Sequence, residues 1–290
     1  MSGVPSLILN ADDFGLTPGV NRSVVELQEA GALTSATLMA TGAGFRAAAE
    51  EAAAHTDLGV GCHVVLVDGR PALPWTEIRG LAGTSGEFRR TLGALVRDLM
   101  RGKVPEDEIE AEATAQIRRL QAAGIYVTHV DTHKHTHMFV RVLRPLLRAA
   151  QSCGVSAIRN PFEPEWALAA TPRAPSKRLW QVRLLRARLG AFLRLVREAG
   201  LATTDGAVGV LATGTLESTT LRELLERMPE GTWELVCHPG YIDASLDGVR
   251  TRLLESRAIE HAALLDVVPA YLSGHPEMRL THFGRLNAMQ

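Results

Sequence analysis

The chain has 290 residues, of which 46% are hydrophobic and 22% charged, and its 31 Lys and Arg against 32 Asp and Glu give a formal net charge of −1 at pH 7. This ordinary globular composition excludes a disordered chain or a collagen-like array, and it offers no overall electrostatic reason to bind nucleic acid. Three cysteines without a CxxC pair favour a reducing compartment, and since neither a signal peptide nor a run of 18 apolar residues is evident, we expect a cytoplasmic protein.

Short apolar runs alternate with longer helical patterns, which is typical of βα units and a parallel sheet. The predicted strands are residues 7–10, 35–39, 58–66, 126–131, 156–159, 207–211, 234–238 and 279–283. A helix with Pro18 near its first position and Gly31 after its end follows the first strand. The other predicted helices cover 45–54, 106–122, 140–152, 177–198, 216–227 and 251–265. Without an internal repeat or linker, this pattern predicts one α/β domain over residues 1–290, a regular or distorted (β/α) barrel.

Polar residues stand at the carboxyl ends of these strands, where the loops of a barrel form its mouth. Asp12 and Asp13 follow the first strand directly, in NADDFG. One of the two carboxylates can bind a cation while the other acts as a base, although a helix N-cap followed by an exposed acid also explains such a pair. His63 and His238 each come directly after a cysteine that we interpret as buried packing, and His238 is a candidate general acid.

The segment THVDTHKHTH carries an imidazole or a carboxylate at every second position. These residues are His129, Asp131, His133, His135 and His137. If the backbone stays extended, a period of two places all five on one side. A metal with open coordination positions needs about three protein ligands, so the others would orient those ligands or bind substrate. A His-rich surface loop is the alternative interpretation.

Taken in order, NADDFG, GCHVVL, THVDTHKHTH and CHPGYID resemble the YdjC-like family of carbohydrate deacetylases and span residues 10–243. The resemblance implies a barrel of the polysaccharide-deacetylase and glycoside-hydrolase type, which hydrolyses an N-acetyl group of an amino sugar with one divalent cation. It also implies that Asp13, His63 and His133 bind the metal, that Asp12 is the general base and that His238 is the general acid. Mixed His and carboxylate ligation suits zinc, without excluding magnesium or manganese.

Further positions of the motifs are assigned to substrate binding under the same resemblance. They are Asp131, His129, His135, His137 and Arg70. The stretch CHVVLVDGRPALP, which contains Arg70, resembles the hopanoid-biosynthesis-associated branch more than the chitooligosaccharide branch. That branch implies an N-acetylglucosaminyl group on a bacteriohopane lipid, such as N-acetylglucosaminyl bacteriohopanetetrol, as the substrate.

Eight basic residues and no acid lie between Arg173 and Arg197. The apolar residues at helical spacing in this segment are Val182, Leu185, Leu189, Phe192 or Leu193, and Val196. An amphipathic helix with a basic face is suited to peripheral contact with an anionic membrane, here the inner membrane surface. A helix packed on the core with a solvated arginine face has the same pattern, so both interpretations stay open.

Three other functions remain open at this point. The chain could be a chitooligosaccharide deacetylase, an inactive sugar-binding protein or a metal-dependent phosphoesterase, a class that often assembles two or three metals. A glycosidase would need a second acid opposite the Asp12 region, and the sequence shows none. The expected partners are an N-acetylated glycolipid or amino sugar and an anionic membrane, and the sequence leaves a homodimer open.

Overall fold

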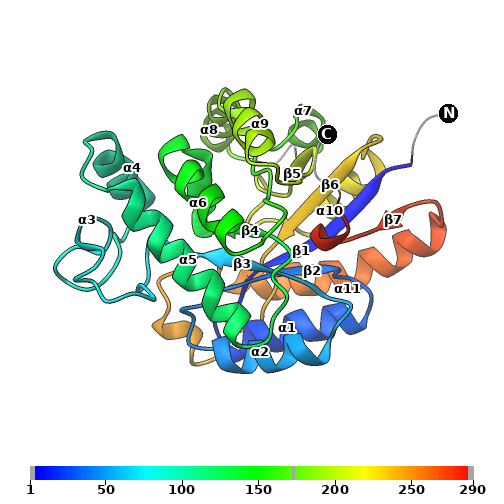
Figure 1. Cartoon of the computed structure of the whole chain (residues 1–290). Helices are drawn as coiled ribbons and strands as arrows, with labels where there is room; N and C mark the ends of the chain where they lie inside the picture. The colour runs from blue at the N-terminus through cyan, green and yellow to red at the C-terminus, as the bar shows by residue number, and fades with distance from the viewer. Residues whose placement is uncertain (1–3, 172–173, 287–290) are drawn as a thin grey trace.

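The computed structural model describes residues 4–171 and 174–286, and a curled parallel sheet flanked by helices forms its centre (Figure 1). The described strands are Ser6–Phe14 (β1), Ser35–Leu38 (β2), Gly59–Val64 (β3), Val130–Thr132 (β4), Gly206–Val208 (β5), Thr232–Cys237 (β6) and Arg279–Leu280 (β7). They lie in the order β4-β3-β2-β1-β6-β5, and β7 pairs with the start of β1. Every pairing between them is parallel, so this half-barrel confirms the predicted α/β fold.

Helices follow most of the strands and cover the sheet. They are Pro18–Glu29 (α1), Phe45–Ala54 (α2), Arg79–Ala82 (α3), Leu92–Met100 (α4), Glu106–Ala122 (α5), Val140–Ser152 (α6), Glu165–Ala169 (α7), Ser176–Arg186 (α8), Leu189–Glu198 (α9), Ser218–Glu226 (α10) and Glu255–Gly274 (α11). Three 3-10 turns are His133–Met138 (η1), Leu246–Gly248 (η2) and Phe283–Arg285 (η3). Figure 1 shows α1, α2 and α11 side by side beneath the sheet. Among the described residues, no helix combines the length and apolarity that crossing a membrane requires.

Most of the regular elements match the sequence prediction. The predicted helices 45–54, 106–122 and 140–152 have the bounds of α2, α5 and α6. Pro18 begins α1, and the Thr17 side chain caps that helix. The strand β1 is buried from Leu7 onwards, as expected for a parallel strand covered on both faces.

The predicted strand at 156–159 is wrong as a strand. This segment makes only isolated parallel bridges, from Ile158 to Val130 and from Ala157 to Ala202. Its backbone still carries the curl of the sheet beyond β4, because Arg159 N donates to Val130 O at 3.1 Å. The strand β4 itself begins at Val130 rather than at 126, so most of the predicted strand 126–131 lies outside the regular sheet.

The predicted helix 177–198 is two helices, α8 and α9, that meet at Ala187 and Arg188. The break separates two environments, because α9 buries Phe192 and Val196 whereas none of the described residues of α8 is buried. The prediction of one continuous apolar stripe is therefore wrong. The short helices α3, α4 and α7 were not predicted, and α11 begins later and runs further than 251–265. That the whole chain is one domain stays a prediction.

Candidate active site

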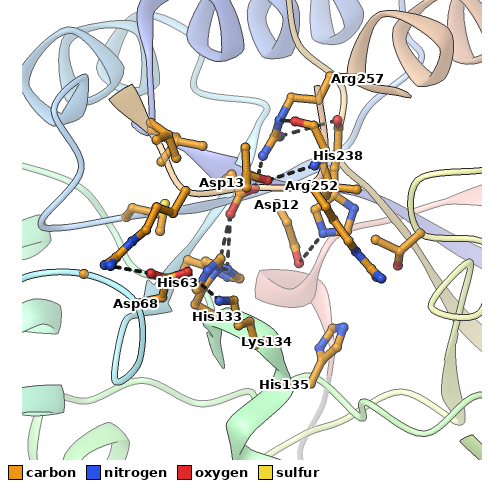
Figure 2. Close-up of a pocket in the computed structure, with 18 of the residues that line it drawn as sticks. Asp12, Asp13, His63, Asp68, His133, Lys134, His135, His238, Arg252 and Arg257 are labelled. Carbon is orange, nitrogen blue, oxygen red and sulfur yellow. Dashed lines mark hydrogen bonds and ion pairs between the residues drawn. The ribbon is translucent and has the colours of Figure 1, made fainter. Parts of the chain in front are cut away.

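A cavity of about 860 Å³ opens at the carboxyl ends of β1, β3, β4 and β6 (Figure 2). All five residues predicted as catalytic or metal-binding line it, namely Asp12, Asp13, His63, His133 and His238. They come from segments far apart in the sequence, and the parallel sheet brings them together because the ends of its strands share one edge.

Three of these residues converge on one point. Asp13 Oδ1 lies 3.6 Å from His63 Nε2 and 3.4 Å from His133 Nδ1, and these two nitrogens are 3.2 Å apart. Two ligand atoms bound to zinc at tetrahedral positions lie about 3.3 Å apart, so the spacing suits a cation at their centre. Asp13 Oδ1 is buried and has no hydrogen-bond partner in the described chain, as expected of an oxygen reserved for a metal.

The backbone at the end of β1 explains how two adjacent acids reach one cavity. Successive side chains of a strand point to opposite faces. Asp13, however, has a left-handed φ of 66°, and the register with β2 shifts between Ala11 and Phe14. This distortion turns the Asp13 carboxylate back to the edge where Asp12 lies, and a non-glycine residue keeps such a conformation only when its surroundings hold it.

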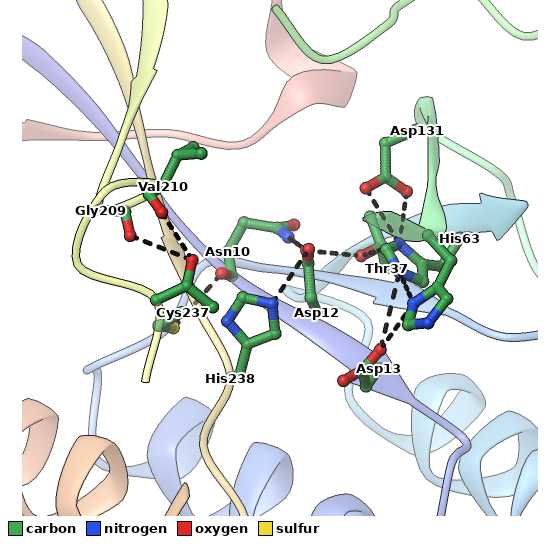
Figure 3. Close-up of polar contacts among 12 residues, drawn as sticks. Asn10, Asp12, Asp13, Thr37, His63, Asp131, Gly209, Val210, Cys237 and His238 are labelled. Atoms are coloured by element: carbon green, nitrogen blue, oxygen red, sulfur yellow. Dashed lines mark hydrogen bonds and ion pairs between the residues drawn. The ribbon is translucent and has the colours of Figure 1, made fainter. Parts of the chain in front are cut away.

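Asp131, the register partner of His63 on β4, contacts the imidazole of His63 and fixes its orientation (Figure 3). His63 Nδ1 lies 2.8 Å and 2.9 Å from the two oxygens of Asp131, which leaves Nε2 free to face Asp13 and His133. Burial alone would lower the pKa of His63, but the carboxylates of Asp131 and Asp12 raise it to about 9. A cation bound here would displace that proton.

Asp12 is held by a buried guanidinium that the sequence analysis missed. Arg159 is fully buried, and its Nη2 and Nη1 bind Asp12 Oδ1 at 2.6 Å and Oδ2 at 2.9 Å. The same side chain also binds Asp131 and Glu234. Burial would raise the pKa of Asp12, but Arg159 holds it well below its usual range. The only sequence signal was an arginine at the carboxyl end of the predicted strand 156–159.

A second group of potential ligands, formed by Asp12, His63 and Asp131, is an ionic network rather than a metal site. Both carboxylates already bind Arg159, and His63 Nδ1 already bonds to Asp131. A cation would have to displace the guanidinium from a buried position. The described residues therefore offer one plausible cation position at this mouth.

Asp13 has its own arginine, which sequence reasoning also missed. Arg257 Nη2 lies 2.6 Å from Asp13 Oδ2, and the Arg257 side chain is 1% exposed. Burial would raise the pKa of Asp13, but the Arg257 charge lowers it well below the usual value. One carboxylate oxygen is thus neutralised by Arg257, and the other faces the two histidines.

His238 stands on the opposite side of Asp12 from His63, as Figure 3 shows. Its Nε2 lies 3.7 Å from Asp12 Oδ2, and its backbone N–H donates to Glu260 Oε2 at 2.6 Å. Its Nδ1 is buried, and no described residue bonds to it. Burial lowers the pKa of His238 to about 4, so the imidazole is neutral at pH 7.

The expected alternation of the His cluster is wrong. The extended backbone ends at Thr132, and η1 follows, in which Lys134 and His135 have left-handed φ angles of 57° and 51°. The turn places His133 and His135 on the cavity lining.

The other motif residues assigned to substrate do not line the cavity. His129 stacks on Phe283 with ring centroids 3.9 Å apart, and the buried His137 Nδ1 bonds to Thr132 Oγ1 at 2.7 Å. Asp131 contacts His63 Nδ1 at 2.8 Å instead. The Arg70 side chain is 81% exposed and pairs with a surface glutamate. Of these predicted substrate-binding residues, His135 alone reaches the cavity.

Comparison with known proteins places these features in context. Residues 6–270 match the family model described as YdjC-like protein. A carbohydrate deacetylase of Geobacillus stearothermophilus is 32% identical over 260 residues, which cover 89% of each chain. A carbohydrate deacetylase of Mus musculus is 34% identical over 81% of this chain and 78% of its own.

One further match covers only part of the chain, and another is a match between structures. A carbohydrate deacetylase of Brevibacillus brevis is 42% identical, but the match covers 54% of this chain and 59% of that protein. A crystal structure from Enterococcus faecalis V583, described as a cellobiose-phosphate cleavage protein, aligns with a TM-score of 0.75 and 24% identity. This alignment covers 97% of this chain and 98% of the other, and it shows a shared fold.

Proposed function

The chain belongs to the YdjC-like protein family, and from this premise we propose that it is a carbohydrate deacetylase that depends on a divalent metal and removes the N-acetyl group of an N-acetylglucosaminyl substrate. The observation that carries the proposal is the convergence of two imidazole nitrogens on the unpartnered Asp13 Oδ1, with Asp12 and His238 beside them.

The residues present fit a divalent cation. Asp13, His63 and His133 would hold it, and Asp131 would keep His63 in the correct orientation and tautomer. When bound, such a cation supplies Lewis-acid polarisation of the acetamide carbonyl and a lower pKa for water. Two imidazoles and one carboxylate suit zinc best, with magnesium as the alternative for the same oxygen ligand.

Asp12 would take the proton of the attacking water. Its low pKa keeps it ionised, and bonds from Arg159, Thr37 Oγ1 and Asn10 Nδ2 fix its carboxylate. A carboxylate with so low a pKa is a weak base, and it can act only on a water that is already acidified. The hydrogen bonds that lower its pKa therefore let Asp12 act as a base only towards a water that a bound cation has acidified.

His238 would return a proton to the departing amine. Because its pKa is about 4, His238 is neutral before the reaction and cannot donate until it receives a proton. Asp12 Oδ2, 3.7 Å from His238 Nε2, is the nearest source, so the proton taken from water can pass to His238 and then to the amine. In this scheme Asp12 and His238 would act in turn as base and acid.

The cavity is of a size that accommodates a sugar. Its volume of about 860 Å³ lies within the usual range for small-molecule pockets, and His135 presents an imidazole whose Nδ1 meets no partner in the described residues. Burial lowers the pKa of His135 to about 3 and keeps it neutral, so it can accept from or donate to a sugar hydroxyl.

The test combines mass spectrometry of the products with metal analysis. N-acetylglucosaminyl bacteriohopanetetrol and diacetylchitobiose, incubated with the enzyme, should show loss of one acetyl group. Asp13→Ala, His63→Ala and His133→Ala should lose both bound metal and acetate release. Full activity in metal-free His133→Ala would contradict the proposal.

A phosphoesterase is disfavoured by the same geometry. Phosphoesterases with His and Asp clusters often use two or more metals, whereas Arg159 occupies the second group of potential ligands. An inactive sugar-binding protein would need neither an acid nor a base, and the presence of Asp12 and His238 on the cavity lining favours an enzyme. Metal stoichiometry, expected to be one tight ion per chain, separates the deacetylase from the phosphoesterase.

For the carrier of the sugar we propose the hopanoid glycolipid rather than a chitooligosaccharide, with α8 contacting the membrane. Trp180 and Leu184, one turn apart on α8, are 64% and 53% exposed. Arg178 on the same helix lines the cavity, so a lipid anchored beneath α8 could present its sugar to the site. Of the predicted basic segment, Arg173 lies outside the described residues.

A further inference from the structure

Three loops at the mouth of the cavity meet at one carboxylate, that of Asp68 (Figure 2). Asp68 follows β3, and its Oδ2 lies 2.6 Å from Lys134 Nζ in η1. Its Oδ1 lies 3.0 Å from Arg250 Nη2, in the loop before α11. The Asp68 side chain is 8% exposed, whereas the side chains of Lys134 and Arg250 are 34% and 49% exposed.

Hydrogen bonds hold the backbone at Asp68 in place. Its backbone N–H donates to Arg89 O at 2.8 Å, and Phe88 N donates to the carbonyl of the next residue, Gly69, at 2.9 Å. These bonds to residues 88 and 89 hold Asp68 in its left-handed conformation, with φ of 58°. A side chain that binds the Asp68 carboxylate is tied to the body of the protein.

Lys134 lies in a turn whose left-handed backbone needs a stabilising contact of this kind. It follows His133 directly, and both Lys134 and His135 are left-handed, which costs a non-glycine residue about 1–2 kcal/mol each. A backbone of this kind persists only where other contacts hold it. The far end of the turn is held by Thr132 Oγ1, which accepts from His137 N at 3.0 Å, and the near end by the Lys134 side chain.

We propose that Asp68 and Lys134 are positioning residues for His133, an inference that rests on the proposed metal site. The ion pair holds Lys134 in its left-handed conformation. This conformation sets the direction in which the chain leaves His133, and therefore where His133 Nδ1 lies relative to Asp13 Oδ1. Neither Asp68 nor Lys134 touches the cation position itself.

A purely electrostatic effect and a positioning role predict opposite changes in cation affinity for the substitution Lys134→Met. Lys134→Met removes a positive charge near the cation position, which by electrostatics alone should strengthen cation binding. If Lys134 instead positions His133, the same change should weaken it. Arg250→Met removes a similar charge from the same carboxylate and leaves the turn intact, so it is the matched control.

The experiment measures Co²⁺ binding to the purified full chain by chelator competition and by visible absorption. Lys134→Met and Asp68→Asn should each raise the Co²⁺ dissociation constant about 10-fold and change the absorption bands of the bound ion. Lys134→Arg, which can keep the pair, should restore both, and Arg250→Met, which loses a similar charge, should bind Co²⁺ at least as tightly as the wild type. Unchanged or tighter binding in Lys134→Met with an unchanged spectrum would overturn the proposal, as would equal weakening in Arg250→Met. Absence of Co²⁺ binding in the wild type would instead refute the metal site itself.

Discussion

Replacing Arg159 by methionine should destabilise the fold far more than the loss of any surface ion pair. The Arg159 side chain is wholly buried and binds the carboxylates of Asp12, Asp131 and Glu234. Methionine fills much of the same space without the charge. The buried carboxylates then lack a counter-ion, and removing one partner of a buried pair typically costs about 3–5 kcal/mol.

The magnitude can be worked out from the pH. A buried carboxylate that has lost Arg159 can avoid being an unpaired charge by binding a proton. At pH 7 this protonation costs about 4 kcal/mol for a group with a reference pKa of about 3.9. At pH 5 the same protonation costs about 1.5 kcal/mol. In the wild type, Arg159 holds the pKa of Asp12 below its unfolded value, so Asp12 is ionised and this stabilisation is present at both pH values. The difference between pH 7 and pH 5 arises in the variant, where burial without a counter-ion raises the carboxyl pKa and the group takes up a proton. The loss in Arg159→Met should therefore shrink from about 4 kcal/mol at pH 7 to about 1.5 kcal/mol at pH 5.

Urea unfolding of the chelator-treated protein at the two pH values measures this difference, and chelation removes the stabilisation that bound metal would add. Arg222→Met is the control, since Arg222 and Asp266 form a pair 2.7 Å apart whose side chains are 51% and 60% exposed. That change should cost about 0–1 kcal/mol at either pH. If Arg159→Met costs no more than the control, or costs the same at pH 5 as at pH 7, the reasoning about buried charge is refuted.

Four further outcomes follow from the site. Asp131→Ala should weaken metal binding about 10–100-fold without removing a ligand, and unchanged affinity in chelator competition would show that Asp131 does not orient His63. Metal affinity should rise between pH 6 and pH 9, because a cation must displace the proton of His63, whose pKa is about 9. Calorimetry in buffers of different ionisation enthalpy should detect the released proton, and binding without proton release would contradict this prediction. His238→Ala should lower kcat about 10²–10⁴-fold while metal content stays constant, and a loss of metal would assign it a different role. Arg183→Glu with Arg194→Glu, both on exposed positions of α8 and α9, should abolish flotation with anionic liposomes, and wild-type protein that does not float would end the membrane proposal.

The sequence predicted the acids and histidines of the candidate site that stand near the ends of predicted strands. Asp12, Asp13, His63 and His238 follow or end apolar runs, and a parallel topology necessarily gathers such ends at one edge. The turn after β4 could not be predicted in the same way. A period of two describes the residues from His129 to His137 only while the backbone is extended, and two left-handed residues end that regularity.

The two arginines were not predicted. Arg159 ends the predicted strand 156–159 and Arg257 lies in the predicted helix 251–265, but nothing in either local pattern indicates which acids they bind. Arg159 and Arg257 become significant only through tertiary contacts, and the acids Asp12 and Asp13 that they bind lie more than a hundred residues away in the sequence. The burial of a guanidinium depends on the carboxylates around it, and sequence periodicity carries no record of that pairing. Long-range charge pairs therefore remain the part of this site that only the three-dimensional structure reveals.

These two arginines also explain how identical neighbours come to have different roles. Arg159 binds both oxygens of Asp12, which leaves that carboxylate ionised and fixed but unable to give an oxygen wholly to a cation. Arg257 binds only Oδ2 of Asp13, so Oδ1 stays free and faces His63 and His133. The proposed division between a base and a metal ligand thus rests on the number of carboxylate oxygens that each arginine occupies, not on any difference between the two aspartates.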